Sequence, residues 1–522
     1  MPKEKAKSAA NKRAYEKRKQ RLQSNPELLN EFKEKHRRAQ NMYRQRQKGE
    51  TPGDSPTPQS GPSTAPPQTA PSVTPSHPVC TLDLVSGVLG VQVHESAGVI
   101  EWHGGLRTVA PTLIREGKNY LHFDENYVRN VASYAAAIPG SRFIDFLDSS
   151  SYTDSYDLVV AIRQSLSAGR PVVVRNFDYL PSFTFTEDGL RRHFGIPPTM
   201  SVDIHDTERR VVDFGNPHVN GQLGDVMAGI NDPDQCRFVL SIPLTHRSMP
   251  PSISMLDDGL TVGWSQTQTH MPFEKRKVSA DNLAVRSWAL AHQAGVFTYP
   301  HQDADGEATY AIVVSGVKLW TLYFSCDPTQ SRDQLLQHFN NLCDPDANVH
   351  PQLTAETVCL YPGDLLIQPP GQFHSVYTPT AAFTIGGHFY SYECFHLTEI
   401  ARYFDVTLKG ELTNQVHHHS LETLMQMIVG LPHLDRERKL KKNTLLALCL
   451  MVIHPKRYRL KVHDTIRSTQ VSAYCQTIAT DIVNSMGGPE FDPQHPYFGK
   501  RSYVDAGEDV DWILLISNWL KC

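Results

Sequence analysis

The sequence predicts a mainly β core that closes as a small antiparallel barrel, with helices beside it and after it. Three observations predict this architecture. Two β-rich runs lie on either side of Ser315-Gly316, which favours a hairpin with a short turn. A shorter apolar run, Leu365-Leu366-Ile367, is bounded by a turn and by prolines. His301 and Asp303 lie two residues apart, so a strand would project both side chains from one face.

His301, Asp303 and His374 are the residues that say most about chemistry. Two imidazoles and one carboxylate can hold non-haem Fe(II) on one face and leave the opposite face open to a co-substrate and oxygen. His374 would have to come from a later strand than the other two. The chain contains 24 histidines, so an isolated His-x-Asp can arise by chance. The metal site is therefore a hypothesis that the surrounding sequence has to support.

The sequence before His374 supplies the first support. Pro362-Gly363-Asp364 is typical of a turn, and Pro369-Pro370-Gly371 ends the short strand that follows it. Turn, strand, tight turn and histidine in this order resemble the second motif of the cupin barrels. That architecture carries metals inside a double-stranded β-helix, or jelly roll.

Lys318 supplies the second support. On the strand after Ser315-Gly316 it shares a face with Trp320, Leu322 and Phe324. A cation on an apolar, inward face costs several kcal/mol unless an anion meets it. In an iron site of this class the partner would be the distal carboxylate of 2-oxoglutarate. The alternative is a lysine at an edge strand whose head group reaches solvent.

Four segments together resemble the JmjC (Jumonji C) domain, and the resemblance covers about residues 140 to 410. It is closest to the histone lysine demethylases that elsewhere carry F-box or PHD-finger appendages. A looser match, Ala168–Arg175, resembles the usual opening strand of such domains. The four segments are Thr298–Asp303, Ser315–Trp320, Gly371–Pro379 and Gly386–Phe389.

The resemblance implies a ligand set and a reaction. It implies that His301, Asp303 and His374 bind Fe(II), and that Lys318 and Thr298 bind 2-oxoglutarate, with O2 as the second co-substrate. The enzyme would then be a dioxygenase that hydroxylates an N-methyl group of a protein lysine, on a histone tail, and releases formaldehyde.

Three positions depart from the family pattern. The tyrosine that helps hold 2-oxoglutarate in the demethylases is Ala311 here, and Tyr310 would point to the other face of a regular strand. An asparagine from an earlier strand has no counterpart. His388 stands where Asn usually follows the double glycine. Two further functions stay open: a protein or RNA hydroxylase of the same fold, and a chromatin-binding module without catalysis.

Charge and composition limit the functions that the rest of the chain can have. The net charge is −4 over 522 residues, yet residues 1–50 hold sixteen Lys or Arg against six Glu. This basic, helix-forming but partly disordered arm would serve as a nuclear import signal or contact nucleic-acid phosphates, or would be a solvated tail. Nine scattered cysteines without a CxxC pair argue against disulfides and zinc-finger readers. No apolar stretch approaches a membrane span. We expect a nuclear protein.

The sequence divides into five segments. The basic arm (1–50) is followed by a Pro/Ser/Thr-rich linker (51–79), the first part of the globular body (80–139), the catalytic domain (140–410) and a helical C-terminal region (411–522). Helices are predicted at Ser155–Ser167, Leu421–Val429, Leu440–Ile453 and Val471–Asn484, the last three as a bundle against the barrel or as a dimer surface. We expect His417-His418-His419 to be exposed loop residues, and Trp512 and Trp519 to belong to the core.

Overall fold

The computed structural model describes residues 97–516, apart from 178, 181, 213–215, 245–248, 268–277, 279–281, 283–284, 340–341, 343–351, 411–412, 415–416, 418, 459–468 and 488–504. The expected basic arm and linker, His418 and Trp519 therefore lie outside the described residues. The chain divides into two units, residues 1–81 with 209–217, and residues 82–208 with 218–522. The sheets and the candidate site belong to the second unit.

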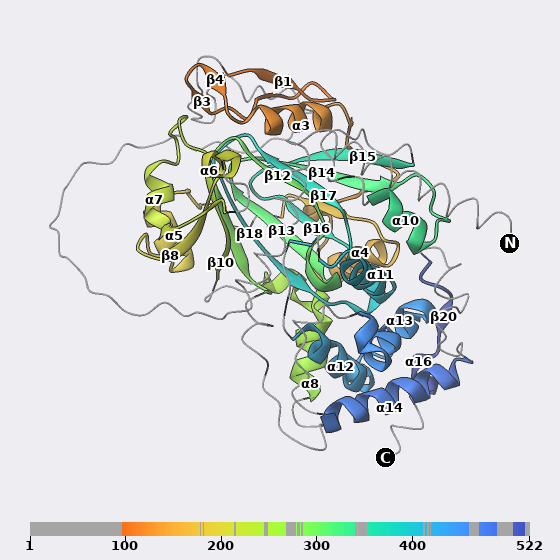
Figure 1. The fold of residues 1–522 in the computed structure, drawn as a ribbon. Coiled ribbons are helices and arrows are strands. Elements are labelled where there is room, and N and C mark those ends of the chain that lie inside the picture. Colours follow the sequence, from red (N-terminus) through yellow and green to blue (C-terminus); the bar gives the residue numbers. More distant parts are fainter. Residues whose placement is uncertain are drawn as a thin grey trace. The chain divides into compact units, whose positions relative to one another are not determined.

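Two large β-sheets form the centre of the second unit (Figure 1). Neighbouring strands run antiparallel, except for two parallel pairs, β6 with β7 and β15 with β5. The nine-stranded sheet has the order β6 (Asp145–Asp148), β7 (Val172–Arg175), β16 (Leu365–Gln368), β13 (Ala308–Ser315), β18 (Ala382–Phe389), β11 (Trp288–His292), β10 (Arg237–Pro243), β8 (Ser201–Asp206), β9 (His218–Gln222). The five-stranded sheet has the order β12 (Val296–His301), β17 (His374–Thr378), β14 (Lys318–Ser325), β15 (Leu353–Leu360), β5 (Ala135–Ala136).

The two sheets face each other and share one apolar core. Ala311 and Val313 of β13 pack in the same buried cluster as Trp320 and Leu322 of β14, which belong to the other sheet. The intervening residues of β13, such as Ile312, pack on the outer side in a cluster that includes the apolar face of a helix, α4 (Ser155–Ser167). Alternation along each strand therefore divides the interior from the outer layer. This arrangement confirms the predicted jelly-roll core.

The predicted hairpin at Ser315-Gly316 is wrong. β13 pairs with β16 and β18, whereas β14 pairs with β15 and β17, so the connection crosses from one sheet to the other. Gly316 has φ +77°, and a Cβ there would lie 2.1 Å from the carbonyl oxygen of Ala381. A glycine is thus required by both the backbone and the close approach of Ala381. The strand and turn signals were local, whereas the choice of strand partner depends on the distant strands that cover each face.

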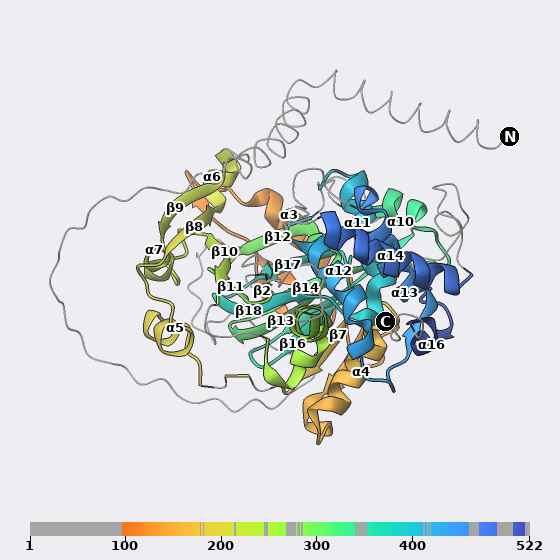
Figure 2. The ribbon, with the colours of Figure 1, turned by 90° about the horizontal axis from the view of Figure 1, so that it is seen from below.

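Helices cover the outer faces and fill the C-terminal region. Asp154 caps α4 by accepting a hydrogen bond from the Tyr156 amide, as its position before the predicted helix favours. The predicted C-terminal helices are also observed, as α12 (Ser420–Gly430), α13 (Lys442–Ile453) and α14 (Thr469–Ser485). They share a core with Tyr390, Tyr392 and Phe395, which follow the last barrel strand, so the bundle packs against the barrel (Figures 1 and 2). Trp512 lies in this core, as expected.

The remaining elements are short or peripheral. Among the described residues, none of the helices combines the length and the apolar character that crossing a membrane requires. The other helices are α3 (His122–Ala132), α5 (Glu187–Phe194), α6 (Thr207–Val212), α7 (Leu223–Ala228), α8 (Ser265–Thr267), α10 (Arg332–Phe339), α11 (Phe395–Thr407) and α16 (Trp512–Ile516), and the other strands are β1 (Val99–Glu101), β2 (Arg107–Val109), β3 (Ile114–Arg115), β4 (Lys118–Asn119), β19 (Leu440–Lys441) and β20 (Asp509–Val510). The helical turns are η1 (Ser149–Ser151), η2 (Pro251–Leu256), η3 (Gly259–Trp264), η4 (Ala304–Gly306), η5 (Tyr392–Cys394), η6 (Leu431–His433) and η7 (Pro455–Arg457).

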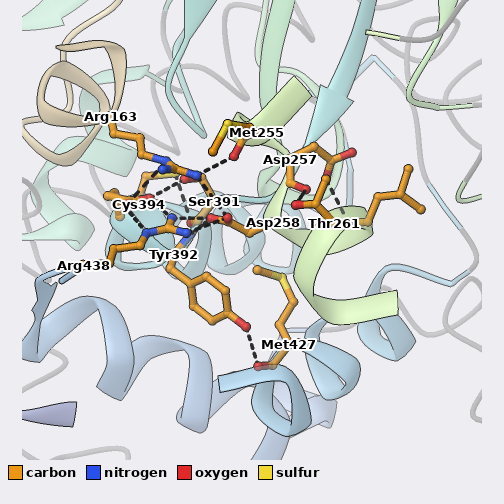
Figure 3. Close-up of polar contacts among 12 residues, drawn as sticks. Arg163, Met255, Asp257, Asp258, Thr261, Ser391, Tyr392, Cys394, Met427 and Arg438 are labelled. Carbon is orange, nitrogen blue, oxygen red and sulfur yellow. Dashed lines mark hydrogen bonds and ion pairs between the residues drawn. The ribbon is translucent and has the colours of Figure 1, made fainter. Parts of the chain in front are cut away.

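A buried cluster of charges joins the barrel to the C-terminal region (Figure 3). Arg438 donates to Asp258 at 2.7 Å and to Glu393 at 2.6 Å, and Arg163 of α4 lies 3.4 Å from Asp258. The side chain of Asp258 is 1% exposed, and it also accepts a hydrogen bond from the backbone N–H of Tyr392. Burial alone would raise the pKa of Glu393, but Arg438 and Arg163 lower it to about 2.

Replacing Arg438 should therefore destabilise the protein strongly. Arg438→Met leaves two buried carboxylates with one guanidinium, a change that costs about 3–5 kcal/mol. Because the pKa of Glu393 lies below its ordinary value of 4.5, the contribution of the pair is present above pH 4.5 and is lost as the pH falls toward 2. Urea unfolding at several pH values measures both effects. The exposed Arg436→Met is the matched control, and equal unfolding midpoints for the two variants would contradict the prediction.

Candidate metal centre

The three predicted metal-binding side chains meet at one end of the five-stranded sheet. Antiparallel pairing of β12 with β17 places His301 directly opposite His374. The strand stops at His301, so Asp303 lies just beyond it rather than within it. One donor atom from each residue lies within 4.8 Å of the other two, close enough for all three to reach one ion. Asp303 Oδ1 is 3.7 Å from His301 Nε2 and 4.0 Å from His374 Nε2.

The backbone orients both imidazoles. His301 Nδ1 lies 2.8 Å from the carbonyl oxygen of Tyr299, and His374 Nδ1 lies 3.0 Å from that of Gln372. A carbonyl oxygen only accepts, so Nδ1 carries the proton in both rings and Nε2 keeps a free lone pair. Metal-binding histidines are held in this way by a hydrogen bond at the other nitrogen. Both lone pairs belong to the nitrogens nearest Asp303.

Neighbouring hydrogen bonds fix the Asp303 carboxylate. Thr309 donates to Oδ2 at 2.6 Å and Asn414 donates to Oδ1 at 2.7 Å. His388 Nδ1 in turn lies 3.0 Å from the Thr309 hydroxyl. The residue that replaces the expected Asn therefore helps to orient Thr309, which binds Asp303. Burial would raise the pKa of Asp303, but the imidazoles of His374, His388 and His301 and the Thr309 hydroxyl lower it to about 2. The carboxylate is therefore ionised at neutral pH.

The middle residue of the His-x-Asp motif anchors the strand end. Gln302 is fully buried, and its amide donates to Asp405 Oδ1 of α11 at 2.6 Å. Burial raises the pKa of Asp405 well above its ordinary value, with Asp305 as a further cause. This contact holds the metal centre against α11, while the side chains on either side of Gln302 face the metal centre.

Lys318 is 0% exposed, which excludes the alternative of a surface lysine. Its Nζ lies 2.7 Å from His292 Nδ1, and burial lowers the pKa of Lys318 to about 7. Burial, Lys318 and His205 hold the pKa of His292 well below its ordinary value, so the imidazole is neutral. Within the described part of the chain, no carboxylate pairs with Lys318, and the buried Nε2 of His292 has no hydrogen-bond partner. The Lys318 amine, positioned by His292 Nδ1, is therefore the group that an anion would meet here.

Thr298 lies on the same inner face by register. It is opposite Val376 of β17, and Val376 is opposite Trp320 of β14. Residues that face each other across strands project from the same side of a sheet, so Thr298, Lys318 and His374 share the inner face. The residues next to Thr298, Phe297 and Tyr299, pack against Tyr127 of α3.

The side chains at positions 310 and 311 point as the sequence predicts. Ala311 belongs to the inner core, whereas Tyr310 belongs to the outer cluster and donates to the carbonyl oxygen of Arg286 at 3.1 Å. Ala311 pairs with Gly386, where a Cβ would lie 2.4 Å from the indole of Trp288. Because residues 311 and 386 are small, the Trp288 indole can pack against them on the inner face of the sheet. The indole Nε1 is buried and has no hydrogen-bond partner among the described residues.

Sequence reasoning missed His292, Thr309 and Asn414. His292 had a detectable signal, because it is the polar residue of an otherwise apolar strand and shares its face with Trp288. Asn414 reaches Asp303 from a separate loop, which no local pattern reveals. The prediction that His417 is exposed is wrong: it is 1% exposed, and its Nδ1 lies 2.8 Å from Glu307 Oε2.

Curated proteins from three fungi are similar to part of this chain. A JmjC domain-containing histone demethylation protein 1 of Kluyveromyces lactis is 28% identical over 170 residues, which make up 30% of this chain and 33% of that protein. Proteins of the same name from Debaryomyces hansenii and Aspergillus fumigatus are 33% and 30% identical over 20% and 22% of this chain. The matches span 22% and 8% of those two proteins, so each covers a third or less of its relative. No protein-family model matches the chain.

The buried His374 should make the metal-free protein sensitive to acid. Burial, with His301 nearby, lowers the pKa of His374 from 6.5 to about 4. Between these values the unfolded chain binds a proton that the folded chain does not, so stability falls as the pH falls from 6.5 to 4. His374→Gln should remove up to about 3 kcal/mol of this loss. Urea unfolding in the presence of a chelator measures it, with the exposed His122→Gln as control. Parallel stability profiles for wild type and His374→Gln would contradict the assignment.

Proposed function

We propose that this chain, a JmjC-domain protein by its likeness to the three fungal relatives, is an Fe(II)- and 2-oxoglutarate-dependent dioxygenase that demethylates lysine side chains of histones. The observation that carries the proposal is a fully buried lysine that has no acidic partner among the residues the structure describes, on the same sheet face as a two-histidine, one-aspartate centre. When bound, Fe(II) with 2-oxoglutarate and O2 supplies the oxidising power that hydroxylates a C–H bond, with succinate and CO2 as co-products.

Different residues of the inner face would bind the metal and the co-substrate. His301, Asp303 and His374 would hold the metal through Nε2, a carboxylate oxygen and Nε2. β14 places Leu322 opposite His374, and Lys318 lies four residues further along, about 13 Å at roughly 3.3 Å per residue. An extended lysine side chain and a five-carbon diacid together span such a distance.

The far carboxylate of 2-oxoglutarate would be held by the Lys318 ammonium and by the Thr298 hydroxyl. His292 would position the Lys318 head group through its Nδ1. The buried surroundings keep water from the two donors, which strengthens their attraction for an anion. This fit of donor set to diacid supports the choice of 2-oxoglutarate as co-substrate.

The acidic charge of residues 51–522 and the similarity to the fungal proteins favour a histone tail as the substrate. The relatives carry histone demethylation in their names. Residues 1–50 have a balance of +10 within a net charge of −4, so the rest of the chain sums to −14, which complements a basic tail. Hydroxylation of a lysine N-methyl group gives a hemiaminal, which releases formaldehyde and leaves the demethylated amine. The basic arm would direct the protein to the nucleus and allow contacts with nucleic-acid phosphates.

A hydroxylase of a protein side chain or an RNA base is the second candidate. Ala311 and His388, where the demethylases have Tyr and Asn, favour it because both positions lie on the strands that face the metal centre. A chromatin-binding module without catalysis is disfavoured by the complete donor set.

The test incubates the full chain with Fe(II), ascorbate, 2-oxoglutarate and a panel of methylated histone peptides, and follows peptide mass, formaldehyde and succinate together. Loss of one methylene from a peptide with an equal amount of formaldehyde is the expected result. Succinate with an oxygen gained by a peptide or an RNA would support the hydroxylase instead. Absence of succinate from the iron-loaded protein would overturn the dioxygenase.

Asp303→Ala should reduce succinate formation by about a hundredfold or more, because it removes a metal ligand together with its charge. The fold should persist, since Asp303 lies beyond the end of β12 and outside the apolar core. Iron content and turnover are measured in parallel. Asp188→Ala, an exposed carboxylate of α5, is the control. Normal turnover by Asp303→Ala would remove the metal assignment.

Lys318 should make 2-oxoglutarate binding depend on pH. Its pKa of about 7 in the ligand-free protein means that the ammonium loses its proton as the pH rises above 7. The dissociation constant should rise by up to about tenfold per pH unit above 7, because the anion then has to bring a proton with it. Calorimetry on the manganese-loaded protein measures this. Lys318→Met should bind weakly at every pH, while the exposed Lys118→Met should behave as wild type. A pH-independent affinity in wild type would mean that another residue holds the carboxylate.

A further inference from the structure

A second group of metal-binding side chains lies on the last two strands of the nine-stranded sheet. The antiparallel register of β8 and β9 places His205 directly opposite His218. Asp203 precedes His205 by two residues on β8, so all three side chains project from the same face. One donor atom of each lies within 4.8 Å of the other two.

The contacts within this group are those of ligands that share an ion. His218 Nδ1 lies 2.8 Å from Asp203 Oδ2, and the His205 and His218 rings are 4.0 Å apart between centroids. Two donors on one tetrahedral ion lie roughly 3.3–3.6 Å apart, because each bond measures about 2.0–2.2 Å. The contact between Asp203 and His218 is therefore within about 1 Å of that spacing. His218 Nδ1 is shielded from solvent and makes no hydrogen bond to any residue that the structure describes, despite its nearness to the carboxylate. The distance between His218 Nδ1 and Asp203 Oδ2 is therefore that of an ion pair, but the angle does not suit a hydrogen bond.

Phe238 of β10 separates this group from the candidate metal centre. Its ring stacks on His205 with centroids 4.6 Å apart and an interplanar angle of 23°, and it lies 5.2 Å from the ring of His292. Phe238 is opposite both His205 and His292 in the register, so the group occupies the same sheet face as His292. Two strand spacings, about 10 Å, lie between β8 and β11. The two groups therefore have no donor in common.

We infer that Asp203, His205 and His218 form a second metal site, which binds a divalent ion, zinc, with water in the fourth position. Two imidazoles and one carboxylate are ligands that zinc takes in tetrahedral sites with one open position. Asp203 is half-exposed and His218 is a quarter exposed, so the ion enters from solvent and keeps its water. Because β9 is the edge strand of the sheet, the ion links this edge to β8 and keeps the two strands in register.

The experiment counts tightly bound zinc in the full chain without an added histidine tag. The protein is stripped with a chelator, loaded with zinc, desalted and analysed for metal. In the Asp303→Ala background, which removes the iron-type centre, one zinc ion per chain should remain. Adding His218→Gln or Asp203→Asn should remove it, with a loss of affinity of a hundredfold or more, whereas adding the exposed His122→Gln should not.

Cobalt provides a second readout that does not depend on the number of ions. Co(II) bound to Asp303→Ala should give the intense visible bands of a tetrahedral site, and Asp203→Asn should abolish them. Asp203 is exposed enough that this substitution preserves folding, which circular dichroism checks. Absence of bound metal from Asp303→Ala, or retention of the bands in both Asp203→Asn and His218→Gln, would overturn the second site. Neither result bears on the proposed dioxygenase, which turnover measures separately.

Discussion

The candidate site depends on one constraint, a buried lysine that has no counter-charge within the described part of the chain. Lys318 is 0% exposed, and its closest polar neighbour is a neutral imidazole. Burial has lowered its pKa to about 7, so at neutral pH the amine is poised between its two forms. An isolated ammonium in such surroundings is costly, and an incoming dicarboxylate relieves that cost. Lys318 therefore favours the binding of an anion.

The architecture explains how this cation and the metal donors face each other. Regular alternation on β14 and β17 projects Lys318 and His374 into the space between the two sheets. The opposite sheet contributes His292 to the same space and carries Ala311 and Gly386 at neighbouring positions, where the Trp288 indole packs. The C-terminal helices pack on the barrel through an apolar core and a buried charge cluster, so this geometry rests on contacts far from the chemistry.

The sequence contained the parts of the site that depend on local spacing. The face of the strand after Gly316 and the boundaries of α4 follow from the periods of strands and helices, and the structure places them as expected. His301 and Asp303 also converge, although β12 ends at His301 and Asp303 lies beyond the strand. The features that depend on contacts between distant parts of the chain were not predicted from the sequence. The strands on either side of Gly316 join different sheets, His417 is buried by its pairing with Glu307, and Asn414 reaches the metal centre from a distant loop. Such contacts are chosen by the packing of the whole chain.

One spectroscopic measurement tests most directly whether the metal centre and the buried cation act on the same molecule. Under anaerobic conditions, 2-oxoglutarate is added to the Fe(II)-loaded protein while visible absorption is followed. A charge-transfer band is expected in wild type, where it marks the keto acid bound to the metal. The band should be absent in His374→Ala and should require far more 2-oxoglutarate in Lys318→Met. A wild-type protein that binds iron and shows no such band at saturating 2-oxoglutarate would contradict the proposal that the metal centre binds the keto acid.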